Sequence, residues 1–200
     1  MGSQAAVIHS GVKDLSVPSS PAGIFINLET ETTSSSFPSD FYSTPSINPF
    51  FGGTQIGTSA ELQPVLTELP STPGEGQIAN LPLGTVIDAS GVFTGLENGS
   101  STHTGLGLGQ FQPGVPGYIG FYIEPGPSSD RFYGWMRLTV ESGSPGTVHE
   151  WAIQSDPGVP VLAGLLQAVP EPSSLVLLYL SLILVLRRAR MRKESHSSWN

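Results

Sequence analysis

The sequence predicts an all-β protein: an antiparallel β-sandwich, with a jelly roll as one form of it, followed by a Pro-rich linker and one C-terminal transmembrane helix. Three observations support this prediction. Short segments in which apolar and polar residues alternate recur through the first 166 residues. The chain holds 24 Gly and 18 Pro in 200 residues, which places turns between those segments. Near the C-terminus, an aliphatic run follows a Pro-Glu-Pro triplet.

The candidate strands are short and are separated by Gly, Pro and Ser. In chain order they are AVIHSGVKDLSV (6–17), GIFINLE (23–29), LGTVIDAS (83–90), GYIGFYIE (117–124), RFYGWMRLTVE (131–141) and GTVHEWAIQ (146–154). The segment ESGSPGT at 141–147 supplies turn residues, so 131–154 is predicted to be a hairpin. Residues 34–60 and 67–77, rich in Ser and Pro, are predicted to be long surface loops.

The alternation also assigns side chains to the faces of the predicted hairpin. In its first strand, Phe132, Met136, Leu138 and Val140 share one face, and Tyr133, Trp135, Arg137 and Thr139 share the other. In its second strand, Val148 and Ala152 oppose His149, Trp151 and Ile153.

Three aromatic residues of this hairpin are candidates for contact with a sugar. Tyr133 and Trp135 lie on one strand face, and Trp151 lies on the neighbouring strand. An exposed aromatic platform on a β-sandwich can stack against sugar rings. A sandwich also needs large aromatic side chains to fill its core, and core packing is the favoured interpretation of all three.

Charge is distributed unevenly along the chain. Residues 1–186 contain three of the eight Lys and Arg and fifteen of the sixteen Asp and Glu, a net charge of −12. The last fourteen residues carry a net charge of +4. An acidic body argues against a nucleic-acid partner, because affinity for phosphate comes from Lys and Arg. The chain has no Cys, which excludes disulfides and cysteine-based zinc sites or nucleophiles.

No residue pattern in the body indicates catalysis, a cofactor or a specific metal site. The histidines His9, His103, His149 and His196 lack the spacing of metal ligands, and the pair His149-Glu150 is expected on a strand surface. The body has no G-x-S-x-G nucleophile motif, and GLGLGQ at 105–110 lacks the context of a dinucleotide site. No calcium-binding loop is present, which leaves loose calcium binding by the acidic surface as an alternative. We therefore predict that the chain is not an enzyme and takes no cofactor.

The C-terminal segment has the composition of a membrane anchor. Residues 175–186 read LVLLYLSLILVL, and Arg187, Arg188, Arg190, Arg192 and Lys193 follow directly. The 17 residues from 173 to 189 would form a helix roughly 25 Å long, which spans a thinned bilayer if the flanking arginines extend to the headgroups. The alternative is a buried core helix, but the β-rich body offers no helical layer for it. The basic cluster would stay cytoplasmic and the body would lie on the opposite side.

The tail resembles the PEP-CTERM protein-sorting signal over about an eighth of the chain. Its three parts occur in order: Val169, Pro170, Glu171 and Pro172, then the aliphatic run, then the Arg-rich end. In that family the apolar run often carries glycines, and this one has none. The resemblance implies export from a Gram-negative bacterium, with the membrane enzyme exosortase as partner and processing near the motif. The protein would then occupy the inner membrane before processing, and afterwards the cell surface or an extracellular polymer matrix.

The body is also similar to other exported PEP-CTERM proteins in the phrases GIFINL, INPFFGGT, YIGFYI, YGWMRL and GTVHEWAI, a similarity that implies no activity. Physically, Pro170 and Pro172 favour an extended backbone at 169–171, a conformation suited to a processing enzyme. The alternative is an ordinary Pro-rich linker ahead of a membrane anchor.

These patterns divide the chain into five parts. They are a remnant of a signal-peptide region at 1–5, a β-sandwich body at 6–166, a linker with the motif at 167–174, the transmembrane helix and basic cluster at 175–193, and a tail at 194–200. The segment Ser3-Gln4-Ala5 has the small residues of a cleavage site, but no apolar leader precedes it. We expect a leader encoded upstream of Met1; the alternative is insertion by the C-terminal segment alone.

The leading hypothesis is an exported structural protein associated with the cell surface or matrix. The alternative is a carbohydrate-binding module that contacts exopolysaccharide. A hydrolase ranks third, because paired carboxylates cannot be located from sequence.

Overall fold

The computed structural model describes residues 6–18, 20, 22–51, 55–70, 76–93, 100–102, 110–126, 129–141 and 144–166. The chain separates into two units, residues 1–168 and 169–200, and every described residue belongs to the first. The N-terminal remnant at 1–5, most of GLGLGQ, the linker at 167–174, the predicted transmembrane helix and basic cluster at 175–193 and the tail at 194–200 all lie outside the described residues. Within the described part of the chain, no helix has the length and apolar character needed to cross a bilayer.

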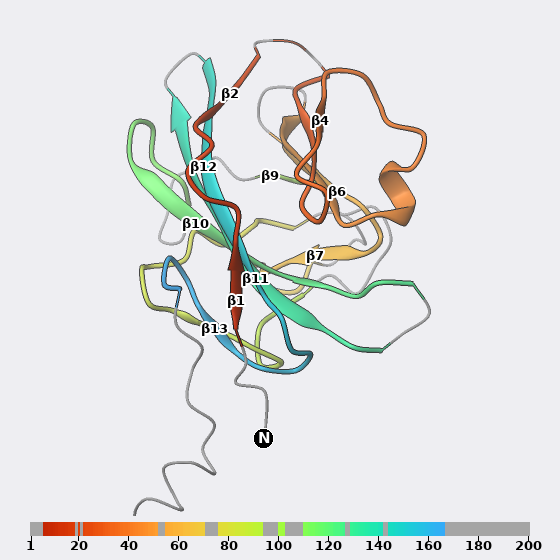
Figure 1. Cartoon of the computed structure of the whole chain (residues 1–200). Coiled ribbons are helices and arrows are strands. Elements are labelled where there is room, and N and C mark those ends of the chain that lie inside the picture. The colour runs from red at the N-terminus through yellow and green to blue at the C-terminus, as the bar shows by residue number, and fades with distance from the viewer. Residues whose placement is uncertain are drawn as a thin grey trace, which may run out of the picture. The chain divides into compact units, whose positions relative to one another are not determined.

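The described residues form strands and one short 3-10 helix (Figure 1). The strands are β1 (Val7–His9), β2 (Leu15–Val17), β3 (Phe25–Asn27), β4 (Thr33–Ser34), β5 (Ser46–Phe51), β6 (Gln55–Thr58), β7 (Leu62–Pro64), β8 (Val86–Ile87), β9 (Ser100–Thr102), β10 (Pro116–Ile123), β11 (Phe132–Glu141), β12 (Ser144–Gln154) and β13 (Val161–Leu162). The helix η1 (Phe41–Ser43) lies between β4 and β5. The predicted all-β class is confirmed for this part of the chain.

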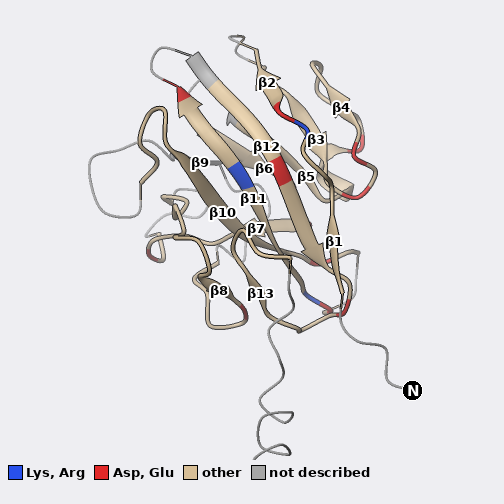
Figure 2. Ribbon diagram, turned by 60° about the vertical axis from the view of Figure 1, so that its left-hand side comes forward, with Lys and Arg blue, Asp and Glu red and all other residues tan. Residues whose placement is uncertain are grey.

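Every strand pair among the described residues is antiparallel. A six-stranded sheet has the order β1-β12-β11-β10-β7, with β2 also paired to β12, and a five-stranded sheet has the order β4-β3-β5-β6-β9. The short strands β8 and β13 form a separate pair. The two N-terminal strands lie along the same edge of β12, as Figures 1 and 2 show.

The predicted hairpin at 131–154 is confirmed, because β11 and β12 pair along most of their length. Gly134 permits close packing at one point of this sheet. A Cβ there would lie 2.6 Å from the ring carbon Cζ of Phe121 and 2.7 Å from the Ala152 carbonyl oxygen. The aromatic ring of β10 therefore lies across a position where only glycine leaves room.

One core lies between the two large sheets. The five-stranded sheet contributes Ile26, Ile47 and Ile56, and the six-stranded sheet contributes Ile119, Phe121, Met136, Leu138, Val140, Val148 and Trp151. The described strands thus have a sandwich-like arrangement. Complete burial of each such side chain stabilises the fold by about 1.5–3 kcal/mol before the cost of ordering it.

A second core lies on the other face of the six-stranded sheet. There, Ile87 of β8 and Val161 of β13 pack with Tyr133 and Trp135 of β11. The β8–β13 pair therefore covers part of a sheet face that would otherwise meet water.

The face assignment for β12 needs a correction. Arg137 pairs with Glu150 and Leu138 pairs with Val148, so His149 is the extra residue of a β-bulge. A single extra residue reverses the alternation that follows it. Trp151 and Ile153 consequently join Val148 on the inner core, and Ala152 lies on the opposite face.

The prediction of one long surface loop at 34–60 also needs a correction. This segment contains η1, β5 and β6, and the side chains of Ile47 and Ile56 are fully buried. Pro49 and a register shift between Asn48 and Phe51 interrupt the alternation that would have marked β5 as a strand.

Candidate functional site

The three aromatic residues considered for sugar contact are all buried. Tyr133, Trp135 and Trp151 are 2%, 1% and 2% exposed. Tyr133 and Trp135 belong to the outer core and Trp151 to the inner core, so the sheet separates them. Their burial agrees with core packing and leaves none of the three rings free to stack on a sugar.

Both tryptophans also anchor other parts of the chain through their indole nitrogens. Trp151 Nε1 donates to the Leu28 carbonyl oxygen over 3.2 Å, which joins β12 to the end of β3. Trp135 Nε1 donates to the Leu165 carbonyl oxygen over 3.2 Å. A buried indole needs such an acceptor, and each bond contributes about 1 kcal/mol.

Tyr122 and Tyr133 form a buried pair of phenols beside Arg131. Burial raises the pKa of both hydroxyls above the usual 10.0, and the nearby Arg131 guanidinium partly opposes that shift. The guanidinium carbon lies 4.4 Å from the centre of the Tyr122 ring, and Arg131 Nε donates to Glu124 Oε2 over 3.2 Å. These contacts join the facing ends of β10 and β11, and the raised pKa values keep both phenols in the protonated form at neutral pH.

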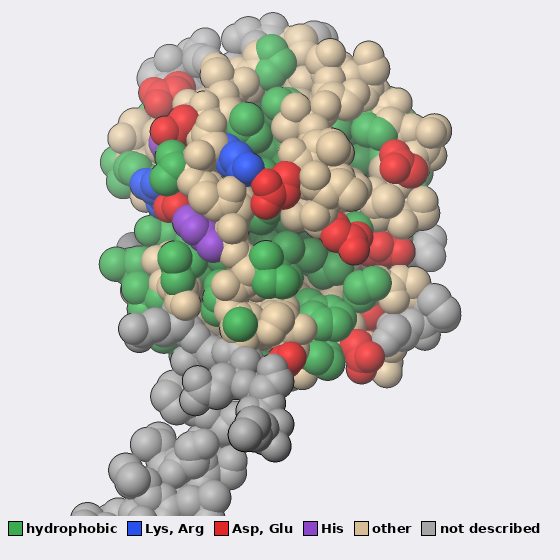
Figure 3. Space-filling view, viewed as in Figure 1, with side chains coloured by type: hydrophobic (Ala, Val, Ile, Leu, Met, Phe, Trp, Pro, Cys, Tyr) green, Lys and Arg blue, Asp and Glu red, His purple; other side chains and the backbone are tan. Residues whose placement is uncertain are grey.

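The uncovered part of the outer sheet face carries a polar network. Arg137 Nε donates to Glu150 Oε1 over 2.7 Å, and His9 Nε2 lies 3.0 Å from Glu150 Oε2. Figure 2 shows the basic residue of β11 beside the acidic residue of β12. On the left of the view in Figure 3, histidine lies close to basic and acidic side chains. Glu150 thus links β1, β11 and β12.

A second chain of hydrogen bonds has the order hydroxyl, imidazole, carboxylate. Thr139 Oγ1 lies 2.8 Å from His149 Nε2, and His149 Nδ1 lies 2.6 Å from Asp14 Oδ1. A nucleophile must meet its substrate, but Thr139 is only 6% exposed, whereas the Asp14 side chain is 61% exposed. This reverses the exposure that a hydrolytic triad requires, so the arrangement is a structural link between β12 and the β1–β2 connection.

His103 and His196 lie outside the described residues. Among the described residues, no group of three His, Asp or Glu side chains gathers in a way that could hold a metal ion.

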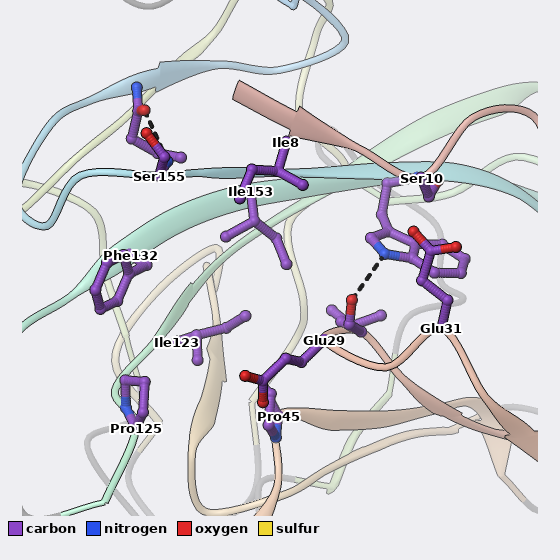
Figure 4. Close-up of a pocket in the computed structure, with 13 residues that line it drawn as sticks. Ile8, Ser10, Glu29, Glu31, Pro45, Ile123, Pro125, Phe132, Ile153 and Ser155 are labelled. Carbon is purple, nitrogen blue, oxygen red and sulfur yellow. Dashed lines mark hydrogen bonds between the residues drawn. The ribbon is translucent and has the colours of Figure 1, made fainter. Parts of the chain in front are cut away.

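A pocket of about 250 Å³ opens beside β1 and β12 (Figure 4). Its walls are mainly apolar, with Ile8, Ile123, Phe132 and Ile153 among them, and the exposed turn between β3 and β4 adds Glu29 and Glu31. Around the middle of the view in Figure 3, apolar side chains gather with acidic side chains beside them. Typical ligand sites measure about 300–1,000 Å³, so this pocket is small for a bound molecule.

The exposed aromatic side chains lie elsewhere, in a group that we call the aromatic surface cluster: Phe25, Phe37, Phe41 and Tyr42. Phe25 and Phe41 are each 4% exposed and form its base, while Phe37 and Tyr42 are each 53% exposed. The rings of Phe37 and Tyr42 lie 5.5 Å apart at an angle of 48°. This cluster was not predicted from the sequence, although FPSDFY at 37–42 holds three aromatic residues that could have indicated it.

In comparisons with known proteins, no family model, no curated protein and no solved structure matches this chain.

Proposed function

We propose that this chain is an exported structural protein of a Gram-negative bacterium, associated with the cell surface or an extracellular matrix. Residues 169–193 act as its PEP-CTERM sorting signal, which exosortase recognises and processes. The proposal depends on one observation above all: the Pro-Glu-Pro triplet, the aliphatic run and the five bases follow one another in that order. The body, a β-sandwich, is the part of the chain that this signal delivers to the cell surface.

Two features of the body support this role. Its core is filled on both faces of the six-stranded sheet, and its two buried tryptophans are hydrogen-bonded. The division of the chain between Ala168 and Val169 also falls directly before the motif. A cut near the motif would release a body that keeps all of its described strands, because β13 ends at Leu162.

The mechanism of sorting follows from the cost of charge in a membrane. Each Arg or Lys costs about 2.5–3.5 kcal/mol at the bilayer centre on insertion scales, so five of them halt translocation. The aliphatic run then stays in the bilayer, and the segment from Val169 to Pro172 stays at its outer face. The two prolines keep that segment extended and accessible to the processing enzyme.

The test is to remove the positive charge. Replacement of Arg187, Arg188, Arg190, Arg192 and Lys193 by Ser or Gln should release unprocessed protein into the medium of a host that has exosortase. Leu175→Asp should have the same effect by weakening insertion. Replacement of the four arginines by lysine preserves the charge and serves as the control, which should be sorted normally. If the neutral variant were localised and processed like the unmodified chain, the five basic residues would not be what halts translocation.

The second candidate function is a carbohydrate-binding module that contacts exopolysaccharide. The exposed rings of Phe37 and Tyr42 favour it, in place of the three buried aromatic residues that the sequence suggested.

A further inference from the structure

We propose that Phe37 and Tyr42 form a binding site for a neutral glycan chain, with Asp40 as an acceptor for its hydroxyl groups. The proposal rests on the proposed extracellular location, where such polymers are present. It names a ligand class for a surface that is separate from the sorting signal.

The rings of Phe37 and Tyr42 each pack against a buried aromatic ring, which restricts their motion. Phe37 packs on Phe25 with ring centres 5.3 Å apart, and Tyr42 packs on Phe41 with ring centres 5.4 Å apart. Because the lower pair is buried, the upper pair loses little conformational freedom on binding. The apolar faces of sugar rings pack on flat aromatic rings, and two tilted rings can contact successive units of a twisted chain.

The segment that carries the two rings also has polar groups without a partner among the described residues. The Asp40 side chain does not cap η1, and neither its carboxylate nor the Tyr42 hydroxyl bonds to a described residue. Asp40 is exposed and directly precedes the helix that carries Tyr42. A short segment that offers aromatic faces, an open carboxylate and a phenol suits a ligand that combines C–H faces with hydroxyl donors.

The charge of the body determines the class of glycan. Each Lys and Arg among the described residues is already paired: Lys13 with Glu31 at 2.6 Å, Arg131 with Glu124 at 3.2 Å and Arg137 with Glu150 at 2.7 Å. An acidic polymer would therefore meet Asp40 and find no unpaired cation on the described surface. A neutral glycan avoids that repulsion.

The experiment uses the full chain in octaethylene glycol monododecyl ether, a detergent whose headgroup contains neither a sugar nor a charged nitrogen. Cellohexaose, xylohexaose, mannohexaose and chitohexaose are titrated by calorimetry, with hexagalacturonate as the acidic comparison. We expect at least one neutral oligosaccharide to bind and hexagalacturonate not to bind. Phe37→Leu and Tyr42→Leu, which keep apolar area but remove the flat ring, should each weaken binding at least about tenfold.

Leu83→Ala, at another exposed apolar residue, is the matched control and should bind like the unmodified chain. Urea unfolding of the two leucine variants checks that they remain folded. The proposal is overturned if no neutral glycan binds, if both leucine variants bind normally, or if hexagalacturonate binds as well as the neutral chains. Displacement of the glycan by choline would also overturn it, because an aromatic pair beside a carboxylate could then be a cation site.

The experiments on glycan binding and on sorting can fail independently of each other. Phe37→Leu and Tyr42→Leu should be exported and processed like the unmodified chain, because the cluster is far in sequence from residues 169–193.

Discussion

His149 Nδ1 lies 2.6 Å from Asp14 Oδ1, although 135 positions separate the two residues in the sequence. The backbone reinforces this contact, because the Lys13 amide donates to the His149 carbonyl oxygen over 2.7 Å. His149 is also the extra residue of the bulge that turns Trp151 toward the inner core. The bulge therefore connects the N-terminal strands to the longest hairpin of the body.

This link predicts the effect of removing the imidazole. His149→Ala loses the bonds to Asp14 and Thr139 and leaves the buried Thr139 hydroxyl without its partner, so it should lower the free energy of unfolding by about 1–3 kcal/mol. Asp14→Asn keeps an oxygen acceptor and should cost less, since Asp14 is largely exposed. Urea unfolding followed by tryptophan fluorescence measures both variants. Equal stability of His149→Ala and the unmodified chain would mean that the link is not stabilising.

The segment at 46–58 should behave as core rather than as loop. Ile47 is fully buried in β5, so Ile47→Ala should lower the free energy of unfolding by about 2–5 kcal/mol. Val115→Ala, at a residue that is 54% exposed, should change it by less than about 0.5 kcal/mol. If Ile47→Ala and Val115→Ala changed the free energy of unfolding by similarly small amounts, Ile47 would not be part of the core.

The buried phenols should make the protein less stable in strong alkali. The folded-state pKa of Tyr122 is raised by burial above 10.0, so its contribution is fully present below about pH 10 and is lost as pH rises through the folded pKa. Urea midpoints measured from pH 8 upward should fall above about pH 10. Tyr122→Phe should make that fall shallower, and should do so more than Tyr42→Phe at a half-exposed tyrosine. A fall of the same steepness in both variants would show that Tyr122 is not its source.

The longest strands were predictable because each alternates over many residues. The segments that became β10 and β11 show apolar residues at every second position, and the turn residues at 141–147 indicated the hairpin. The bulge at His149 was not predictable in this way, because one unpaired residue leaves no local mark in composition but changes every face assignment beyond it.

The burial of Tyr133 and Trp135 could not be predicted with certainty from the sequence, because it depends on tertiary contacts that no local pattern reveals. Alternation placed Tyr133 and Trp135 on one face, but only the packing of the short β8–β13 pair shows that this face is covered. Conversely, Phe37 lies in a Ser-rich segment without alternation, and its exposure follows from the burial of Phe25 and Phe41 beneath it. A candidate binding surface could therefore be identified only from the fold, whereas the sorting signal that we propose at 169–193 is predicted from a linear motif alone.

Mass spectrometry of the protein isolated from the surface fraction of its native host tests the central proposal most directly. If the C-terminal segment is a processed sorting signal, the mature chain should end at roughly residue 170–174 and lack the aliphatic run and the five bases. Detection of intact Trp199-Asn200 on the surface-fraction protein would contradict the proposal.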